Sequence, residues 1–236
     1  MIDIDPGSLP EGDEKLRAVR SMFDAIAPRY DLVNRVMTFR MDVGWRRKTV
    51  RRLHLGPGSL VLDLACGTGD FCRELRAHAL RPIGADLSFG MLSAGTTGEP
   101  LVQADILRLP VPDSSVDGIT CGFALRNLVE LEPFFAELAR VVRPGGRIAL
   151  LEVAEPPNPV LRWVHGVYFG KIVPLIGGLL SDPTAYRYLP KSVAYLPDPT
   201  ELLTMVQSAG FTDATRTLFS GGVSQLLLAS RDDPAW

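Results

Sequence analysis

The stretch VLDLACGTGD, from Val61 to Asp70, decides the fold. Its first half is a short apolar run of the kind that forms a buried strand, and a helical pattern begins at Asp70. Between them Gly67 and Gly69 leave the main chain bare, so that backbone N–H groups can approach a ligand closely. The order of strand, glycine turn and helix predicts a ligand-binding loop at the carboxyl end of a buried strand.

Strand-like and helical segments alternate after this stretch, with short loops between them. The helical pattern from Asp70 continues to about His78, and later ones cover SFGMLSA and PFFAELARVV. The strand-like segments are LVLDLA, RPIGAD, PLVQAD, SVDGITCGF and RIALLEV. The turn RPGG at Arg143–Gly146 ends the last of these helices and precedes the strand RIALLEV. This alternation predicts an α/β fold with a doubly wound, parallel sheet.

The C-terminal segment departs from the alternation. After a helical pattern near Asp198 to Ala209, the segments ATRTLFS and VSQLLLAS flank Gly221 and Gly222, which is the signal of a hairpin. A mostly parallel, seven-stranded sheet with an antiparallel C-terminal hairpin is the architecture of the methyltransferases that use S-adenosylmethionine. Nucleotide-binding oxidoreductases usually lack this hairpin, so that class of enzyme is disfavoured.

We expect an N-terminal tail followed by one domain. Residues 1–20 begin with acidic residues, proline and glycine and contain no apolar signal-peptide core, which indicates a disordered tail. Residues 21–236 are expected to form a single domain. Within it, residues 155–199 are rich in proline, tyrosine and glycine and are too long for a plain loop. We therefore expect them to form a helical cap over the site.

Composition argues against several classes of function. The net charge of −2 gives no basic field for nucleic acid. Cys66, Cys72 and Cys121 are spaced neither as a disulfide framework nor as metal ligands, so we expect no metal and a reduced, cytoplasmic setting. The longest apolar piece, Ile172–Leu180, is half of what a membrane span needs. The histidines occur singly, and none is assigned to catalysis.

The residues around the glycine pair indicate the kind of ligand. A dinucleotide-binding loop has a third glycine where Cys72 stands, so NAD and FAD are disfavoured. Asp63 and Asp70 make the loop acidic, which suits a cationic ligand and repels phosphate. S-adenosylmethionine carries an ammonium and a sulfonium group, and we expect it here. The alternative is a strand–helix turn that binds no ligand.

Two more aspartates end the next two strands. Asp86 ends the second strand, where a carboxylate can accept hydrogen bonds from both hydroxyls of a ribose. Asp105 ends the third strand and is placed to receive an adenine amino group, with Ile106 packing near the ring. Asp86 is also a candidate cap of the following helix, a role for which Ser88 competes. Such features at the ends of three successive strands favour a binding site.

From Met22 to about Leu228 the chain resembles the ubiquinone/menaquinone biosynthesis C-methyltransferases, which methylate a ring carbon of polyprenylated quinols. The segments shared with methyltransferases in general are VLDLACGTGD, GADLSFGML and RVVRPGGRIALLE. The more specific segments are MFDAIAPRYDLVNRVMTFRMDVGWRRKTV, FALRN, AYRYLPKSV and YLPDPTELLTMVQSAGF. The chain departs from the family at Ala124, a glycine in the usual FGLRN, and in LEVA, which replaces LEFS. Gly122 stands where some members have a serine that contacts the cofactor.

The resemblance implies a cofactor site and a catalytic site. Together with the residues argued above, the expected cofactor contacts are Asp63, Gly67, Thr68, Gly69, Asp86, Leu87, Met91, Asp105, Ile106 and Gly122. A quinol carbon becomes nucleophilic when the adjacent hydroxyl loses its proton, so the enzyme must stabilise a developing phenolate. We expect Arg126 to favour the phenolate and Asn127 to hydrogen-bond a quinol oxygen. Tyr30 lies in the segment that covers the cofactor in this family, and we expect it to close over the cofactor or contact the quinol.

Simpler structural roles stay open for the same residues. Arg126 can pair with a carboxylate such as Glu130, four residues on. Tyr30 can serve packing alone. Tyr186 and Tyr188, in the expected cap, are candidates for lining a ring-binding pocket, and packing is favoured for one of the two.

The expected reaction is methyl transfer from S-adenosylmethionine to a polyprenyl quinol, preferably demethylmenaquinol. The alternatives are the benzoquinol precursor of ubiquinone, another phenolic or lipid acceptor, and a non-catalytic scaffold in a quinone-synthesis complex. Because a polyprenyl tail resides in the bilayer, Trp45–Arg52 and Trp163–Leu180 are candidates for peripheral contact with the inner face of the cell membrane. The alternative is that Trp45–Arg52 is a solvated basic helix face and that Trp163–Leu180 is a buried cap helix. No nucleic-acid partner is expected, and a homodimer is left open.

Overall fold

The structure, a computed structural model, describes residues 12–182, 185 and 192–233. The helices are α1 (Gly12–Ile26), α2 (Tyr30–Met37), α3 (Met41–Leu53), α4 (Asp70–Ala77), α5 (Phe89–Ala94), α6 (Leu131–Val141), α7 (Pro159–Val167), α8 (Val173–Leu180) and α10 (Pro199–Ser208). The strands are β1 (Leu60–Leu64), β2 (Arg81–Asp86), β3 (Leu101–Gln103), β4 (Val116–Gly122), β5 (Val142–Val153), β6 (Phe211–Phe219) and β7 (Ser224–Arg231). Short helical turns cover Leu125–Asn127 and Tyr168–Ile172.

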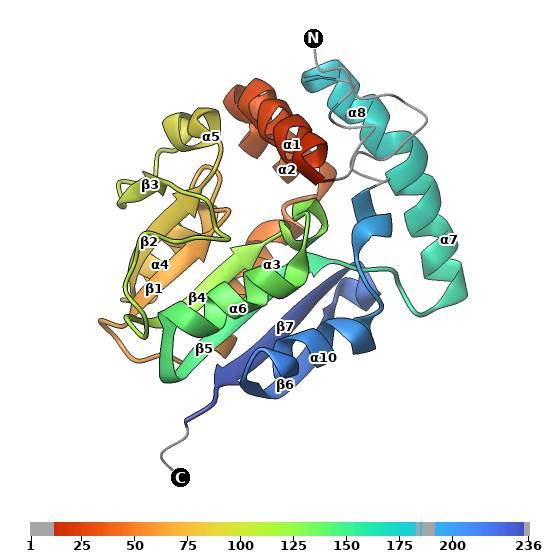
Figure 1. Cartoon of the computed structure of the whole chain (residues 1–236). Coiled ribbons are helices and arrows are strands. Elements are labelled where there is room, and N and C mark those ends of the chain that lie inside the picture. Colours follow the sequence, from red (N-terminus) through yellow and green to blue (C-terminus); the bar gives the residue numbers. More distant parts are fainter. Residues whose placement is uncertain (1–11, 183–184, 186–191, 234–236) are drawn as a thin grey trace.

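The strands form one seven-stranded sheet in the order β3-β2-β1-β4-β5-β7-β6 (Figure 1). β1 pairs in parallel with β2 and with β4, β2 with β3, and β4 with β5. β7 lies between β5 and β6 and is antiparallel to both. The expected doubly wound α/β sheet with an antiparallel C-terminal hairpin is therefore confirmed. Its strand order reverses between β1 and β4, which opens a crevice at their carboxyl ends.

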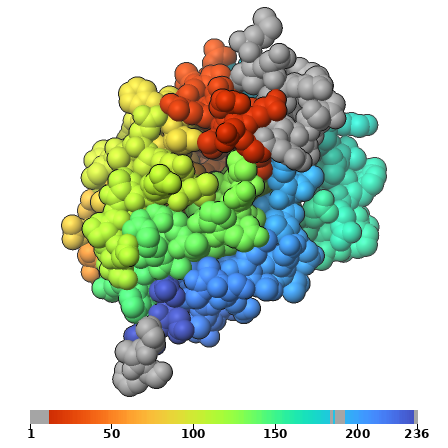
Figure 2. All heavy atoms as spheres, in the orientation of Figure 1, coloured from red at the N-terminus to blue at the C-terminus, as the bar shows by residue number. Residues whose placement is uncertain are grey.

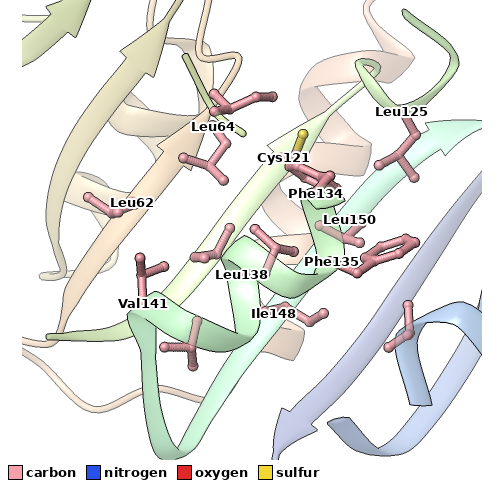
Figure 3. Close-up of a cluster of buried hydrophobic side chains, with 14 of the residues drawn as sticks. Leu62, Leu64, Cys121, Leu125, Phe134, Phe135, Leu138, Val141, Ile148 and Leu150 are labelled. Atoms are coloured by element: carbon pink, nitrogen blue, oxygen red, sulfur yellow. The ribbon is translucent and has the colours of Figure 1, made fainter. Parts of the chain in front are cut away.

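Helices α6 and α10 cover one face of the sheet. Phe134, Phe135 and Leu138 of α6 are fully buried together with Cys121 of β4 and Ile148 of β5 (Figure 3). Full burial of a large apolar side chain stabilises a fold by about 1.5–3 kcal/mol. This cluster therefore fixes the position of β4, whose carboxyl end leads into Leu125–Asn127.

Helices α3 and α4 cover the opposite face. Leu53 of α3 and Phe71 and Leu75 of α4 pack with Leu151 of β5. Trp45 is also buried here, and its Nε1 donates a hydrogen bond to Ser220 Oγ at 2.9 Å. The sequence interpretation of Trp45 as part of a membrane-contacting segment is therefore wrong for this residue.

A third cluster joins the N-terminal helices to the segment after β5. Met22 and Ile26 of α1 and Val33 and Met37 of α2 pack with Val173 of α8. Helix α7, the turn at Tyr168–Ile172 and α8 form one continuous helix of 22 residues, Pro159–Leu180. Among the residues that the structure describes, it alone is long and apolar enough to cross a membrane, by length and composition only. The run Ile172–Leu180 alone is too short to cross a membrane, but the helix that contains it begins at Pro159.

The structure corrects several expectations about local structure. Residues 12–20 are the first part of α1 and not a disordered tail, because Met22, Ile26 and the buried Lys15 hold this helix against the protein. Residues 1–11 lie outside the described part of the chain, as do Tyr186 and Tyr188. The segment RPGG does follow α6, but it is contained in β5, where the pairing with β4 is irregular. Within residues 155–199, the described part contains the helix Pro159–Leu180 and a short turn at Val193–Tyr195.

Candidate active site

The glycine loop joins β1 to α4 in a conformation that needs its glycines. Gly67 and Gly69 have φ values of 56° and 84°, in the left-handed region. A Cβ atom on Gly67 would lie 2.9 Å from Met91 Cε, and one on Gly69 would lie 2.4 Å from Thr97 Cγ2. The Gly67 N–H donates a hydrogen bond to Asp86 Oδ2 at 2.8 Å. The loop is thereby tied to the end of β2.

A cavity of about 350 Å³ lies beyond the carboxyl ends of β1, β2 and β4, and we call it the strand-end cavity. Leu16, Val19 and Phe23 of α1 form its outer side. Its lining includes the following expected cofactor residues: Gly67, Asp86, Leu87, Met91, Asp105, Ile106 and Gly122. These side chains come from segments far apart in sequence, and the parallel sheet brings them to one edge.

Two of the three aspartates that line this cavity, Asp86 and Asp105, hold defined positions. Asp86 Oδ1 accepts the Ser88 N–H at 2.8 Å, in addition to the bond from Gly67, and burial raises the pKa of its carboxyl group. Ser88, not Asp86, caps α5, because Ser88 Oγ accepts the Met91 N–H at 3.1 Å. Asp105 Oδ1 accepts the Leu107 N–H at 2.9 Å. Each carboxylate retains acceptor capacity for a ligand hydroxyl or amino group.

Asp63, Thr68 and Gly69 do not line the strand-end cavity, although all three were expected to contact the cofactor. Asp63 is 1% exposed, accepts a hydrogen bond from Thr120 Oγ1 at 2.9 Å and lies 3.6 Å from Cys72 Sγ. Burial raises the pKa of Asp63 to about 7. Thr68 Oγ1 donates to Asp31 Oδ1 at 2.7 Å. The side chains of Asp63 and Thr68 therefore hold the loop in place but do not line the cavity.

Asp70 also differs from expectation, because it does not make the loop acidic. Its carboxylate pairs with Arg35 at 3.0 Å, with Arg46 at 3.4 Å and with Arg73. Burial would raise the pKa of Asp70, but these guanidinium groups outweigh it and hold the pKa below its usual value. Asp86 and Asp105 are the carboxylates near the loop that a cationic ligand can meet.

A second cavity, of about 340 Å³, lies next to the first, and we call it the apolar cavity. Met22 and Ile26 of α1, Met37 of α2, and Val164 and Val173 of the long helix contribute to its mostly apolar lining. The helices of the N-terminal segment and of the cap therefore enclose it together. It is suited to a hydrophobic molecule with a few polar groups.

Phe23, Tyr30 and Phe123 line both cavities. The rings of Phe23 and Tyr30 meet edge to face, with centroids 5.9 Å apart. Phe123 has a φ of 60°, which is strained for a bulky residue and is found mainly at functional sites. We call these three residues the shared wall, since a molecule in one cavity approaches a molecule in the other across them.

Arg126 lines the apolar cavity and is held by a buried ion pair. Its Nη1 binds Glu152, which is fully buried, and its Nε donates to Ser192 Oγ at 3.1 Å. The alternative role as a paired residue is thus correct in kind, but the partner is Glu152 and not Glu130. Within the described part of the chain, Nη2 makes no hydrogen bond to protein. Pairing therefore leaves one end of the guanidinium group for a ligand.

Asn127 and Tyr30 are the other two expected catalytic residues. Asn127 lines the strand-end cavity, and its Oδ1 is buried without a partner among the described residues. A buried amide oxygen of this kind gains from a ligand donor. Burial raises the pKa of Tyr30, which is therefore a neutral phenol at neutral pH. Its packing against Phe23 and its position in the shared wall are compatible with a contact to the cofactor or the quinol, and also with packing alone.

The sequence analysis missed several residues of the apolar cavity. Arg46 was assigned to a surface basic segment, but it is 7% exposed and pairs with Asp42 at 2.6 Å. Both residues line the cavity. His165, which received no role, also lines it, and burial lowers its pKa. The one available signal was Asp42, which lies four residues before Arg46, the spacing of a helical ion pair.

The strand-end cavity fits S-adenosylmethionine on two independent grounds. Gly67 presents bare backbone to the cavity, and Asp86 and Asp105 offer acceptors at two separate points of the lining. Apolar side chains at Leu87 and Ile106 can pack on an aromatic base. These are the contacts that the ribose and the adenine base of this cofactor need.

Comparison with known proteins identifies the family. The sequence model of the ubiE/COQ5 methyltransferase family matches residues 11–230. The chain belongs to this family. The demethylmenaquinone methyltransferase of Roseiflexus castenholzii is 41% identical over 226 residues, which cover 92% of this chain and 95% of the relative. The ubiquinone/menaquinone biosynthesis C-methyltransferase UbiE of Syntrophotalea carbinolica is 38% identical, with coverages of 91% and 94%.

Solved structures show the same fold. A SAM-dependent methyltransferase from Thermotoga maritima has a TM-score of 0.65 at 15% identity, covering 90% of this chain and 99% of that one. Phosphoethanolamine N-methyltransferase 2 of Haemonchus contortus, solved with S-adenosyl-L-methionine, has a TM-score of 0.59 at 14% identity, with coverages of 80% and 52%. The resemblance and the enzyme class, an S-adenosylmethionine-dependent methyltransferase of the quinone-methylating family, are confirmed.

Proposed function

We propose that this enzyme transfers the methyl group of S-adenosylmethionine to a ring carbon of a polyprenylated quinol, with demethylmenaquinol as the preferred acceptor. The strand-end cavity holds the cofactor, and the apolar cavity holds the acceptor ring and the first part of its tail. The observation that carries the proposal is the shared wall of Phe23, Tyr30 and Phe123, which places the two cavities side by side. The name of the Roseiflexus castenholzii relative supports the choice of acceptor.

The contacts with S-adenosylmethionine follow from the lining of the strand-end cavity. Asp86 accepts the ribose hydroxyls, and Asp105 accepts the adenine amino group, with Ile106 against the ring. Leu87, Met91, Gly67 and Gly122 complete the contacts. A side chain on Gly122 would meet Phe71 Cε2 at 2.7 Å, so a serine does not fit here without a shift of Phe71. Asp63, Thr68 and Gly69 act on the cofactor only through the loop.

The protein must supply an activated ring carbon and alignment. S-adenosylmethionine, when bound, supplies an electrophilic methyl group on a sulfonium. On transfer, the acceptor carbon would take the methyl group, the cofactor would leave as the neutral thioether, and the displaced ring proton would pass to water. Arg126 stabilises the phenolate through its remaining N–H groups, whereas Asn127 lines the strand-end cavity and can accept a hydrogen bond from a ligand group there through its Oδ1. Alignment alone can contribute up to roughly 7–11 kcal/mol in the most favourable intramolecular cases.

Tyr30 has a positioning role in this proposal. A hydrogen bond with the Asn34 side chain, and then the nearby cations Arg46 and Arg126, oppose the rise in its pKa that burial causes. The phenol stays protonated at neutral pH and can donate a hydrogen bond to a quinol oxygen. Its ring holds the acceptor against the shared wall.

A second acceptor is the benzoquinol precursor of ubiquinone. It is favoured by the printed name of the Syntrophotalea carbinolica relative, which covers both quinone pathways. A smaller ring fits the same apolar cavity, so Arg126 serves it without change. We assign the enzyme to the cytoplasm, with peripheral contact at the membrane that contains its acceptor.

The test combines an analysis of the quinones in cells with an assay of the purified enzyme. Quinones from a strain that lacks this enzyme are analysed by mass spectrometry, and the proposal expects a naphthoquinone lighter by one methyl group to accumulate. The purified enzyme is then given S-adenosylmethionine with a demethylated naphthoquinol or a benzoquinol. Faster methylation of the naphthoquinol is expected. An unchanged quinone profile, together with no methylation of either ring, would refute the proposal.

A further inference from the structure

Two segments that line the apolar cavity also reach the protein surface. Phe39 and Met41, between α2 and α3, are 71% and 38% exposed. Leu161 and Val164 of α7 are 47% and 50% exposed. A side chain that both lines a cavity and meets solvent marks the opening of that cavity. The mouth of the apolar cavity is thus bordered by large apolar side chains from two separate elements.

The apolar surface continues from the mouth along the helix Pro159–Leu180. Trp163, Leu175 and Leu179 are each more than 60% exposed, and none of them lines either cavity. This helix forms the right-hand edge of the molecule, shown in teal in Figures 1 and 2. A soluble protein rarely leaves so many large apolar side chains exposed along one helix unless that surface meets a partner or a membrane.

The second half of the helix is fixed to the protein. Val173 and Gly177 are buried, and Tyr168 Oη donates a hydrogen bond to Met37 O at 2.7 Å. Arg29 Nη1 donates to Leu180 O at 2.9 Å. Pulling the helix through a bilayer would break these contacts and open the apolar cavity. The segment Tyr168–Leu180 is therefore held on one side, whereas α7 has no buried residue. A helix held in this way favours an orientation in the plane of a membrane surface.

Cations accompany the exposed apolar side chains, and acidic residues do not. The sequence of Pro159–Leu180 contains Arg162 and Lys171 and no aspartate or glutamate. Arg40, which is exposed, stands between Phe39 and Met41 at the mouth. A surface of this composition complements the anionic head groups of a lipid bilayer.

We propose that the free side of Pro159–Leu180, together with Phe39 and Met41, docks on an anionic lipid bilayer. Docking places the mouth of the apolar cavity against the membrane. The tail of the acceptor then stays partly in the lipid while its ring enters the cavity. This inference rests on the proposed function for the identity of the acceptor, but the docking surface itself does not depend on it.

The experiment measures flotation of the purified enzyme with vesicles of phosphatidylcholine containing about one third phosphatidylglycerol. The variant is Trp163→Ser with Leu175→Gln and Leu179→Gln. The matched control is Phe89→Ser, an equally exposed apolar residue on α5, on a different side of the molecule from the long helix. Vesicle affinity should fall about tenfold or more in the triple variant and stay unchanged in the control.

Two acceptor assays separate docking from catalysis. With a water-soluble demethylnaphthoquinol that has a short tail, the triple variant should match the wild type. With a long-tailed acceptor in the same vesicles, its rate should fall with its vesicle affinity. If wild type and triple variant float equally, the docking proposal is wrong, even when both methylate quinols. Flotation without methylation of any quinol would instead refute the proposed function and leave docking intact.

A second copy of this chain is the competing occupant of the same surface. Sedimentation of the wild type and of the triple variant, without lipid, distinguishes the two. A wild type that dimerises through this surface and ignores vesicles, with a monomeric triple variant, would overturn the proposal. A wild type that binds vesicles, with both proteins in the same oligomeric state, supports it.

Discussion

The strand-end cavity and the apolar cavity have similar volumes, about 350 and 340 Å³, but they are built in different ways. The first takes its polar groups from loops that directly follow β1, β2 and β3, where the strand pattern fixes their position. The second takes Arg46, Arg126 and His165 from α3, a short helical turn and α7. The proposed cofactor site is thus a product of the fold class. The proposed acceptor site is a product of how this chain packs its added helices.

The largest expected effect concerns Arg126 in the apolar cavity. Replacing it alone leaves Glu152 as an unpaired buried charge, which costs about 3–5 kcal/mol of stability and obscures any catalytic effect. The double variant Arg126→Met with Glu152→Gln removes both charges. We expect kcat to fall about 10²–10³-fold, since a donor to the developing oxyanion is lost. Affinity for S-adenosylmethionine, measured by calorimetry, should not change.

The matched control is Arg140→Met with Glu137→Gln. This pair also bonds at 2.7 Å, but neither residue lines a cavity. Its kcat should stay near the wild-type value. Similar turnover in both double variants would mean that Arg126 is a structural residue, and the mechanism proposed for the apolar cavity would fail.

The next effect concerns Asp86 in the strand-end cavity. Asp86→Asn keeps the shape of the side chain but loses the charge that receives the Gly67 and Ser88 N–H groups and the ligand. The Kd for S-adenosylmethionine should rise about 10–100-fold, or roughly 1.4–2.8 kcal/mol. The comparison is Asp117→Asn, whose carboxylate accepts the Leu60 N–H at 2.6 Å but lies outside the cavity. An equal loss of affinity in both would show that Asp86 acts only through the fold.

The third effect concerns Asp63, whose carboxyl group either contacts the cofactor or only stabilises the glycine loop. Its pKa is about 7 in the fold and 3.8 ordinarily, so between these values the native state retains a proton that the unfolded state has lost. Stability therefore falls as pH rises from about 4 to 7, and the penalty persists above 7. Asp63→Asn should raise the free energy of unfolding by about 1–3 kcal/mol near pH 8 and add nothing near pH 4.

Chemical denaturation at the two pH values measures this difference. Binding of S-adenosylmethionine by Asp63→Asn should be close to wild type, because the side chain is buried away from the cavity. A large loss of binding in a folded variant would restore Asp63 as a cofactor contact.

The smallest effect concerns Tyr30 in the shared wall. Tyr30→Phe removes the hydroxyl and keeps the ring, so we expect kcat to fall about 3–10-fold, the value of one hydrogen bond. Tyr168→Phe is the comparison, because its hydroxyl is engaged with Met37 O at 2.7 Å and is not available to an acceptor. Steady-state rates with a soluble acceptor measure both. Equal rates for Tyr30→Phe and the wild type would leave packing as the role of Tyr30.

The sequence by itself determined the fold and most of the cofactor cavity. The run Val61–Asp70, the aspartates that follow β2 and β3, and the glycine pair before β7 are local patterns, and the geometry of a parallel sheet converts them into positions. The family resemblance added Arg126, Asn127 and Tyr30 as candidates. These patterns carry no information about which distant side chains meet.

Only the tertiary structure decided which charged side chains pair and which side chains are buried or exposed. It paired Arg126 with Glu152, neutralised Asp70 with three arginines, buried Trp45 and Arg46, and left one side of Pro159–Leu180 exposed. The physical reason is that a sequence pattern is local, while these contacts join residues far apart in the chain. Periodicity reports which face of an element is apolar, whereas these contacts depend on how helices far apart in the chain are placed against each other.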